Sequence, residues 1–508
     1  MSQYQPIREI VIVGGGTAGW MTAAACSRFL AGGQRRIRLV ESEAIGTVGV
    51  GEGTIPPMLE FNQLLGISEQ DFLRETKATF KLGIDFVGWG AEGERYFHPF
   101  GHIGHTVDGV AFHQLWLKFR AAPGVGPLTD YSMSAAAGLK ARFAHPTRDP
   151  RSPLSSLAYA YHLDAGLYAR LLRKYSEARG VERVEGRIVD VERSQESGHV
   201  AAIRLDDGQR VEGDLFIDCS GFRSLLLGQA RSVPFEDWSH WLPCDRAIAV
   251  PSERIEPLLP YTRATARPAG WQWRIPLQHR TGNGHVYSSV HMSDEDAEAI
   301  LVTNIEGRTV GDFNRLKFKA GRYTRMWDAN VVAIGLSAGF LEPLESTSIY
   351  LIQRGIQKLF ALFPDMRFSE IERDEYNASM AESYVFVRDF IILHYQATQR
   401  PEPFWRDVRA VEMPESLRRK IDLFADKGRI FRYSDELFEL PSWLAVMLGQ
   451  GINPAGHDPL VDGLPEQQLL AGMSQLRRGY ENTALTLPGH AEFVSRALTA
   501  VQPQPSRP

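Results

Sequence analysis

The sequence predicts an α/β fold built on a Rossmann-like parallel sheet. The first fifty residues read as strand, glycine turn, helix and second strand, which is the beginning of a βαβ unit. Two later apolar strands, within 213–224 and 329–347, run into turns of small residues and fit the same sheet. With 508 residues, of which 44% are hydrophobic, the chain can bury a large core and form two or three structural units.

Composition and charge argue against several classes of protein. A net charge of −5 and scattered basic residues disfavour a nucleic-acid surface. Three distant cysteines, Cys26, Cys219 and Cys244, indicate a reduced compartment, and no CxxC pair suggests a zinc or dithiol site. No signal peptide and no apolar run of about 20 residues is visible. We therefore expect a soluble, cytoplasmic protein that binds neither membranes nor nucleic acid, with a homodimer as one option.

The first strand, turn and helix carry a dinucleotide-binding pattern. Ile10–Val13 is a β-branched run typical of a buried parallel strand. Gly14, Gly16 and Gly19 then fit G-x-G-x-x-G: the first permits the turn, the second lets backbone approach a pyrophosphate, and the third allows close packing. A helix that begins near Thr17 would point its N-terminal amides at that phosphate.

The second strand and the later strand–turn units indicate which dinucleotide is bound. Arg36–Ser42 places Glu41 about twenty residues past the glycines, where a carboxylate binds ribose hydroxyls and would repel the 2′-phosphate of NADP. Gly213–Ser224 and Ala329–Thr347 are the kind of units that large FAD enzymes bring back to the glycine turn to hold the ribityl chain. FAD is therefore favoured over NAD.

A hydrolase motif competes for one of these units. Gly335-Leu-Ser337-Ala-Gly339 satisfies G-x-S-x-G directly after a strand, so that Ser337 could be a nucleophile with His394 downstream. This interpretation leaves the glycine turn without a function. Small residues here are equally explained by close approach to a flavin.

Five motifs in order resemble the flavin-dependent halogenases of the tryptophan-halogenase type, and the resemblance runs from about residue 8 to about residue 410. The motifs are GGGTAGWM (14–21), VGVGEGTIPP (48–57), ATFKLGIDFVGW (78–89), GWQWRIP (270–276) and FLEPLESTSIY (340–350).

The resemblance implies an FAD-binding fold of the GR2, flavin monooxygenase-like type, with FAD used as FADH2 and with halide and O2 as co-substrates. Hypohalous acid made at the flavin would chlorinate or brominate an electron-rich aromatic ring. No second nucleotide motif for NAD(P)H is visible, so a separate flavin reductase is expected. The candidate FAD-binding residues are Gly14, Gly16, Thr17, Ala18, Gly19, Glu41, Val50, Gly51, Glu52, Val189, Asp218, Gly335 and Leu336.

The resemblance also places two catalytic residues. Lys81 occupies the position of the family's active-site lysine, in preference to Lys77, and its neighbours are apolar. A lysine in such surroundings either snorkels to water or is held inside for a purpose. Glu345 matches the family's glutamate, in preference to Glu342, and is expected to pair with the amine and either to polarise the oxidant or to accept the proton lost from the ring. A dipole-stabilised acid at a helix N-terminus is the alternative interpretation of Glu345.

Halide would bind backbone amides in a turn at Ser346, Thr347 and Ser348. Well-known tryptophan halogenases have glycine in place of Ser348, which leaves the preference between chloride and bromide open. His98, His102 and His105 invite a metal interpretation, but no nearby carboxylate or thiol completes a site, so we expect no metal.

A second set of residues would separate flavin from substrate. In an extended strand Trp271 and Trp273 project to the same face. By the resemblance they form a wall with a tunnel for hypohalous acid, although an ordinary buried aromatic face is the alternative. His98 and Phe100 would stack on the substrate ring. The substrate and tunnel candidates are His98, Phe100, Trp271, Trp273, Ile275, Pro276 and Trp443.

The predicted organisation is a discontinuous FAD module in residues 1–365, made of 1–95, 150–235 and 325–365. An interleaved substrate module occupies 96–149 and 236–324, and a mostly helical part extends from 366 to 508. The tyrosines and acid that clamp free tryptophan are not recognisable in the C-terminal part, so an indole-like substrate is expected. An FAD-dependent aromatic hydroxylase of the same fold and a catalytically idle flavoprotein remain alternatives.

Overall fold

A six-stranded sheet contains the predicted βαβ unit. The computed structural model describes residues 5–30, 35–44 and 51–499. In the sheet β1 lies at the centre and pairs in parallel with two neighbours, so that Val13 lies beside Val40 and Asp218. In sheet order the strands are β20 (Trp327–Asp328), β21 (Val331–Ala333), β12 (Leu215–Asp218), β1 (Glu9–Val13), β2 (Arg36–Glu41) and β8 (Glu182–Glu185). Only β20, at one edge, runs antiparallel to its neighbour.

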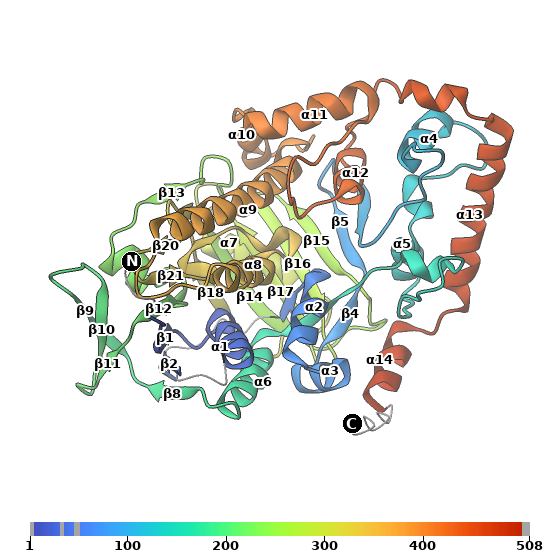
Figure 1. The fold of residues 1–508 in the computed structure, drawn as a ribbon. Coiled ribbons are helices and arrows are strands. Elements are labelled where there is room, and N and C mark those ends of the chain that lie inside the picture. Colours follow the sequence, from blue (N-terminus) through green and yellow to red (C-terminus); the bar gives the residue numbers. More distant parts are fainter. Residues whose placement is uncertain (1–4, 31–34, 45–50, 500–508) are drawn as a thin grey trace.

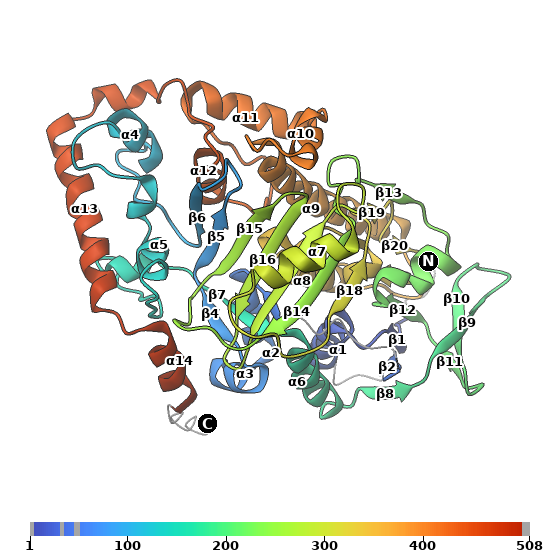
Figure 2. The same ribbon diagram turned by 180° about the vertical axis from the view of Figure 1, so that it is seen from behind.

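A seven-stranded mixed sheet stands beside the first and carries the tryptophan strand near its middle (Figures 1 and 2). Its pairings are antiparallel except the one between β15 and β5. In sheet order the strands are β18 (Asn314–Lys317), β14 (Arg246–Ser252), β17 (Thr281–Tyr287), β16 (Gly270–Pro276), β15 (Thr262–Arg267), β5 (Gly83–Val87) and β6 (Arg95–Pro99).

Three small sheets complete the β structure. In one of them β7 pairs with both β3 and β4, which brings the 51–53 segment beside the strand that ends at Lys81. The strands are β3 (Gly51–Gly53), β7 (Ala160–Asp164) and β4 (Thr79–Lys81); β11 (Arg210–Glu212), β10 (Val200–Leu205) and β9 (Ile188–Arg193); and β13 (Phe235–Asp237), β19 (Gly321–Tyr323) and β22 (Gly339–Phe340).

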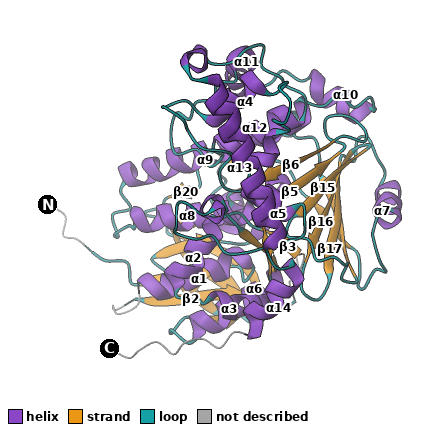
Figure 3. Ribbon diagram, turned by 90° about the vertical axis from the view of Figure 1, so that its right-hand side faces the viewer, coloured by secondary structure: helices purple, strands orange, loops and turns teal. Residues whose placement is uncertain are grey.

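Helices cover these sheets and form the C-terminal part. The earlier helices are α1 (Thr17–Phe29), α2 (Pro57–Leu65), α3 (Glu69–Thr76), α4 (Phe112–Phe119), α5 (Met133–Gly138), α6 (Ala165–Glu177), α7 (Asp294–Thr303) and α8 (Ser348–Ala361). The later ones are α9 (Glu370–Gln396), α10 (Pro403–Ala410), α11 (Glu415–Lys427), α12 (Leu440–Gly449), α13 (Glu466–Thr486) and α14 (His490–Thr499). In Figure 3 α7 lies on the outer face of the large sheet, away from the other helices.

The long helix α9 crosses the molecule and packs against α8, α10, α11 and α12 (Figure 1). Its second half is buried on every side from Val387 to Tyr395, as expected for a helix that lies inside a core. The predicted α/β class and the mostly helical C-terminal part are therefore confirmed. Within the described ranges, no helix has the length and hydropathy needed to span a bilayer.

Candidate active site

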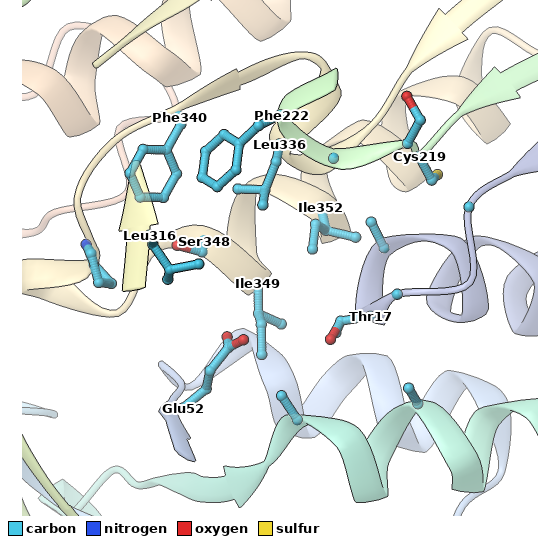
Figure 4. A pocket seen from close by; sticks show the side chains of 18 of the residues that line it. Thr17, Glu52, Cys219, Phe222, Leu316, Leu336, Phe340, Ser348, Ile349 and Ile352 are labelled. Carbon is cyan, nitrogen blue, oxygen red and sulfur yellow. The ribbon is translucent and has the colours of Figure 1, made fainter. Parts of the chain in front are cut away.

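A cavity of about 360 Å³ runs from the glycine turn after β1 to the tryptophans of β16. Figure 4 shows side chains from distant parts of the chain around this space, with Phe222, Leu336 and Phe340 above it in the view, Thr17 to the right and Glu52 to the lower left. Burial raises the pKa of Glu52 to about 7. Of the predicted FAD-binding residues, those that line the cavity are Gly14, Gly16, Thr17, Ala18, Glu41, Gly51, Glu52 and Leu336. Val50 lies outside the described residues.

The glycine turn has the shape of a phosphate cradle. Gly14 has φ +109°, and a Cβ there would lie 2.3 Å from the carbonyl oxygen of Cys219. A Cβ on Gly16 would meet nothing within 4 Å, so this backbone is open to the cavity at the start of α1. Gly19 packs against the carbonyl of Gly14, as the third glycine of the motif should. These residues fit a dinucleotide pyrophosphate at the helix N-terminus.

Glu41 ends β2 and faces the same space. Its carboxylate accepts a hydrogen bond from Arg183 Nε at 2.5 Å and one from Trp20 Nε1 at 3.3 Å. The Arg183 contact was not apparent from sequence because it joins residues that are far apart in the chain. The side chain is therefore held in place at the end of β2, in reach of a ribose.

Trp271 and Trp273 both line the cavity, and their ring centroids lie 6.0 Å apart. This agrees with the two-residue period of a strand, which places both indoles on one face of β16. Gly284 lies opposite Trp273 on β17, and a Cβ there would come within 2.0 Å of its ring. Ile275 lines the cavity too. Pro276 ends the strand, and its carbonyl accepts a 2.6 Å hydrogen bond from Thr79.

Lys81 is fully buried at the end of β4, whereas Lys77 is exposed. Its Nζ donates to Ser346 Oγ at 2.8 Å and to the carbonyl of Thr54 at 3.0 Å, and it lies 5.2 Å from the Phe100 ring centroid. Burial lowers the pKa of Lys81 from 10.5 to about 7, against an opposing effect of the charge on Glu345. The amine can therefore be neutral or charged near neutral pH.

The space around this amine is narrow. Gly53 and Ser346 both line the cavity, and a Cβ on Gly53 would lie 3.2 Å from Lys81 Nζ and 2.8 Å from Ser346 Oγ. Lys81 thus sits directly behind residues of the cavity wall.

Glu345 contacts histidines instead of Lys81, contrary to the predicted pairing. Its carboxylate lies 3.0 Å from His98 Nδ1 and 2.8 Å from His394 Nε2, and all three side chains are buried. His98 and His394 hold the pKa of Glu345 down to about 2 although burial opposes this. Tyr96 OH lies 3.0 Å from the other ring nitrogen of His394. Glu345 is therefore an oriented, ionised acid, and His98 is a partner of that acid.

The residues after Glu345 form a turn that suits an anion. Ser346 is left-handed at φ +59°, Thr347 is right-handed, and Ser348 begins α8. Successive left- and right-handed residues direct backbone N–H groups toward one point. Thr347 is fully buried, and its hydroxyl has no hydrogen-bond partner within the described parts of the chain.

Three predicted FAD contacts are placed differently. Val189 is 54% exposed, and Ile188 lines the cavity instead, because neighbouring strand residues face opposite sides. Arg187, which precedes β9, also lines the cavity. Asp218 is buried beneath the turn after it and accepts hydrogen bonds from the amides of residues 220, 226 and 227. Gly335 packs against Ala18, which leaves Leu336 to face the cavity.

Trp443 lies behind the His98 and Glu345 cluster. It is 2% exposed, donates to the carbonyl of Phe438 at 3.2 Å and makes an edge contact with Phe390. Phe390 in turn contacts both His98 and His394. Trp443 therefore supports the site through Phe390.

The structure removes the basis for a hydrolase at the G-x-S-x-G motif. Ser337 is fully buried, and its hydroxyl donates to the backbone carbonyls of Asp218 and Ile334. His394 is engaged with Glu345 and Tyr96 instead. A nucleophile needs an exposed hydroxyl beside its base, and this serine has neither.

Comparison with known proteins agrees with this geometry. The sequence profile of the family described as "Tryptophan halogenase" matches residues 9–466. The chain belongs to the tryptophan halogenase family. It is a flavin-dependent halogenase, which uses FAD together with halide and O2.

Several relatives of this halogenase are similar over nearly their whole length. BrvH, a flavin-dependent halogenase from Brevundimonas sp. BAL3, superposes with a TM-score of 0.93 at 48% identity over 96% of this chain and 99% of its own. A tryptophan 6-halogenase from Streptomyces toxytricini has a TM-score of 0.89 at 32% identity over 97% of this chain and 100% of its own. The 7-chloro-L-tryptophan 6-halogenase KtzR from Kutzneria sp. strain 744 is 36% identical over 96% of this chain and 99% of its own.

The halogenase site includes residues that sequence reasoning missed. His394 was considered only for a hydrolase, yet it lies against Glu345. Thr54 and Thr262 were not singled out, although one accepts a bond from Lys81 and the other lines the cavity. A histidine in the apolar run FIILHYQ was the one available signal, because a polar ring surrounded by apolar residues needs a buried partner. Within the described segments, no cluster of three or more His, Cys, Asp or Glu could hold a metal.

Proposed function

We propose that this halogenase acts on an indole or a similar electron-rich aromatic, and that Lys81 and Glu345 carry the transfer of halogen. The observation that supports this most directly is the buried Lys81 amine, placed behind Ser346 and Gly53 at the cavity wall. We also propose that segments 1–95, 150–235 and 325–365 form a flavin module of the GR2 type.

Bound as FADH2, the flavin supplies hypohalous acid from O2 and halide. The chain's own residues govern where halide binds and where the acid goes. The backbone N–H groups of Thr347 and Ser348, at the N-terminus of α8, would hold halide, whereas the N–H of Ser346 donates to the carbonyl of Pro343 at 3.1 Å. Trp271 and Trp273 would exclude the organic substrate from the flavin cavity while a small acid passes.

Lys81 would then hydrogen-bond the hypohalous acid and donate a proton to its oxygen. The ring carbon bonds to the halogen as the halogen–oxygen bond breaks, and the oxygen leaves as water. The proton from the ring carbon goes to Glu345, so that an aromatic C–H and hypohalous acid become an aryl halide and water. A carboxylate with a pKa near 2 is sufficient here, because a halogenated ring cation is a much stronger acid.

Free tryptophan is a weaker candidate as substrate. The C-terminal segment 441–460, PSWLAVMLGQGINPAGHDPL, contains no tyrosine and so does not match a segment that would clamp an amino-acid group. Relatives whose names specify tryptophan therefore do not define the substrate here.

The test combines purified protein, a separate flavin reductase, NADH, FAD and O2 with bromide or chloride. Indole and tryptophan are offered in parallel, and products are read by mass spectrometry. We expect monohalogenated indole, with higher kcat/KM than for tryptophan. A hydroxylated product that forms without halide would instead indicate an aromatic hydroxylase.

A further inference from the structure

A second buried glutamate, Glu342, lies near the site and takes no part in the proposed transfer of halogen. Trp271 Nε1 donates a 2.7 Å hydrogen bond to Glu342 Oε2, and the Tyr395 hydroxyl donates a 2.6 Å hydrogen bond to the same oxygen. All three side chains are buried. Glu342 therefore links helix α9 to one of the two cavity-lining tryptophans.

The two glutamates of the sequence EPLE are held by adjacent residues of one helix. His394 lies 2.8 Å from Glu345, and Tyr395 binds Glu342. Trp89 contacts both of these α9 residues, with ring centroids 5.7 Å from His394 and 5.6 Å from Tyr395. One turn of α9 thus determines the position of both the proposed proton acceptor and the Trp271 indole.

A carboxylate is a costly choice for this position. Burial raises the pKa of Glu342 to about 7, and within the described segments its Oε1 has no hydrogen-bond partner. An apolar side chain would fill the space at lower cost if only packing were needed. What the carboxylate adds is one strong acceptor for two donors.

The two indoles are held in different ways. Trp273 packs closely against Gly284, and this close fit restricts its ring. Trp271 packs between aromatic rings, with Trp89 at 6.4 Å and Trp273 at 6.0 Å. Such contacts tolerate more than one ring orientation, whereas a bond from Nε1 selects one.

We propose that Glu342 and Tyr395 are positioning residues that lock the Trp271 indole in the wall, so that hypohalous acid reaches Lys81 without escaping to solvent. This rests on the proposed transfer of hypohalous acid to Lys81. Loss of the lock widens the gap beside Trp271 and leaves the FAD cradle intact, because the glycine turn lies at the other end of the cavity.

The test measures how hypohalous acid is partitioned. The complete enzyme turns over indole and bromide in the presence of a soluble dye that reports free hypobromous acid, and the ratio of bromoindole to oxidised dye is determined. For Glu342→Met and Tyr395→Phe we expect this ratio to fall about tenfold, as for loss of one buried hydrogen bond. FAD affinity should stay within about twofold of wild type. Glu342→Gln, which keeps an acceptor, should restore part of the ratio.

The matched control is Tyr376→Phe, which also removes a buried tyrosine hydroxyl from α9. Unlike that of Tyr395, the Tyr376 hydroxyl has no hydrogen-bond partner within the described parts of the chain. Its ratio should equal that of wild type. In a Trp271→Phe background, Glu342→Met should change the ratio no further, because the donor is already absent. Equal ratios in wild type, Glu342→Met and Tyr395→Phe would overturn the proposal.

A second readout does not depend on turnover. In 15N-tryptophan-labelled protein without flavin, the indole N–H signal lost in Trp271→Phe should shift and exchange faster in Glu342→Met. An unchanged signal would overturn the proposal even if activity differs. If wild type gives no bromoindole, the indole-halogenating function fails, while this signal still tests the bond between Glu342 and Trp271.

Discussion

Replacing Lys81 with methionine should abolish halogenation and stabilise the protein in acid. The pKa of Lys81 falls from 10.5 when unfolded to about 7 when folded, because the folded chain removes the amine from water. At 1.36 kcal/mol per pH unit, burying the charged form costs about 5 kcal/mol below pH 7. Methionine has a similar shape and no charge, but it removes the donor of two hydrogen bonds. The Thr54 carbonyl loses its 3.0 Å donor at a cost of about 1–3 kcal/mol, and the Ser346 hydroxyl, which lines the cavity, loses its 2.8 Å donor.

The dependence on pH separates these two effects. Between pH 7 and 10.5 the unfolded chain binds more protons than the folded one, so the stability of wild type rises with pH in that window. The free-energy cost of the two lost hydrogen bonds does not vary with pH. The advantage of Lys81→Met in the free energy of unfolding should therefore shrink by about 2–3 kcal/mol between pH 6 and pH 9.

The assay is chemical denaturation of wild type and Lys81→Met without flavin at pH 6, 7, 8 and 9. Formation of halogenated product with FADH2 is measured separately. Lys77→Met is the control, because this lysine is exposed, and its stability difference from wild type should not vary with pH. Halogenation by Lys81→Met should fall by at least about 10²–10⁴-fold, while FAD binding persists. A stability difference for Lys81→Met that is constant over this range would refute the buried, partly neutral amine.

Four other substitutions test the site. Glu345→Gln should lower kcat by about 10²-fold. It should also remove the stabilisation that the ionised Glu345 gives wild type above pH 4.5, which wild type loses as the pH falls toward 2; chemical denaturation measures this. Gly16→Ala should fold normally but bind FAD weakly in a flavin titration, because the added methyl group enters the open side of the cradle. Gly14→Ala should instead lower the melting temperature measured by calorimetry, because its methyl group collides with the backbone of Cys219. Gly53→Ala should lower kcat for halogenation, because the added methyl group displaces the Lys81 amine. It should also shift the pKa of Lys81, measured from the pH profile of kcat. An unchanged profile would count against a role for Lys81 in the transfer of halogen.

Patterns within a few neighbouring residues were sufficient to predict the order of elements from β1 to β2. A β-branched run, three glycines at fixed spacing and an acid at the end of the next strand predict the sequence of elements from β1 to β2, and the structure has them. The common face of Trp271 and Trp273 is a consequence of the two-residue period of any strand. These features depend on neighbours within a few residues, so the sequence determines them by itself.

Tertiary structure decided which side chains meet. The sequence predicts Glu345 beside Lys81, but helix α9 places His394 against Glu345, and the Lys81 amine donates to Ser346 instead. Val189 was placed one residue out of phase, because the phase of a short, partly exposed strand depends on the sheet that it joins. Contacts between segments hundreds of residues apart depend on how sheets and helices pack, and no local period in the sequence encodes that packing.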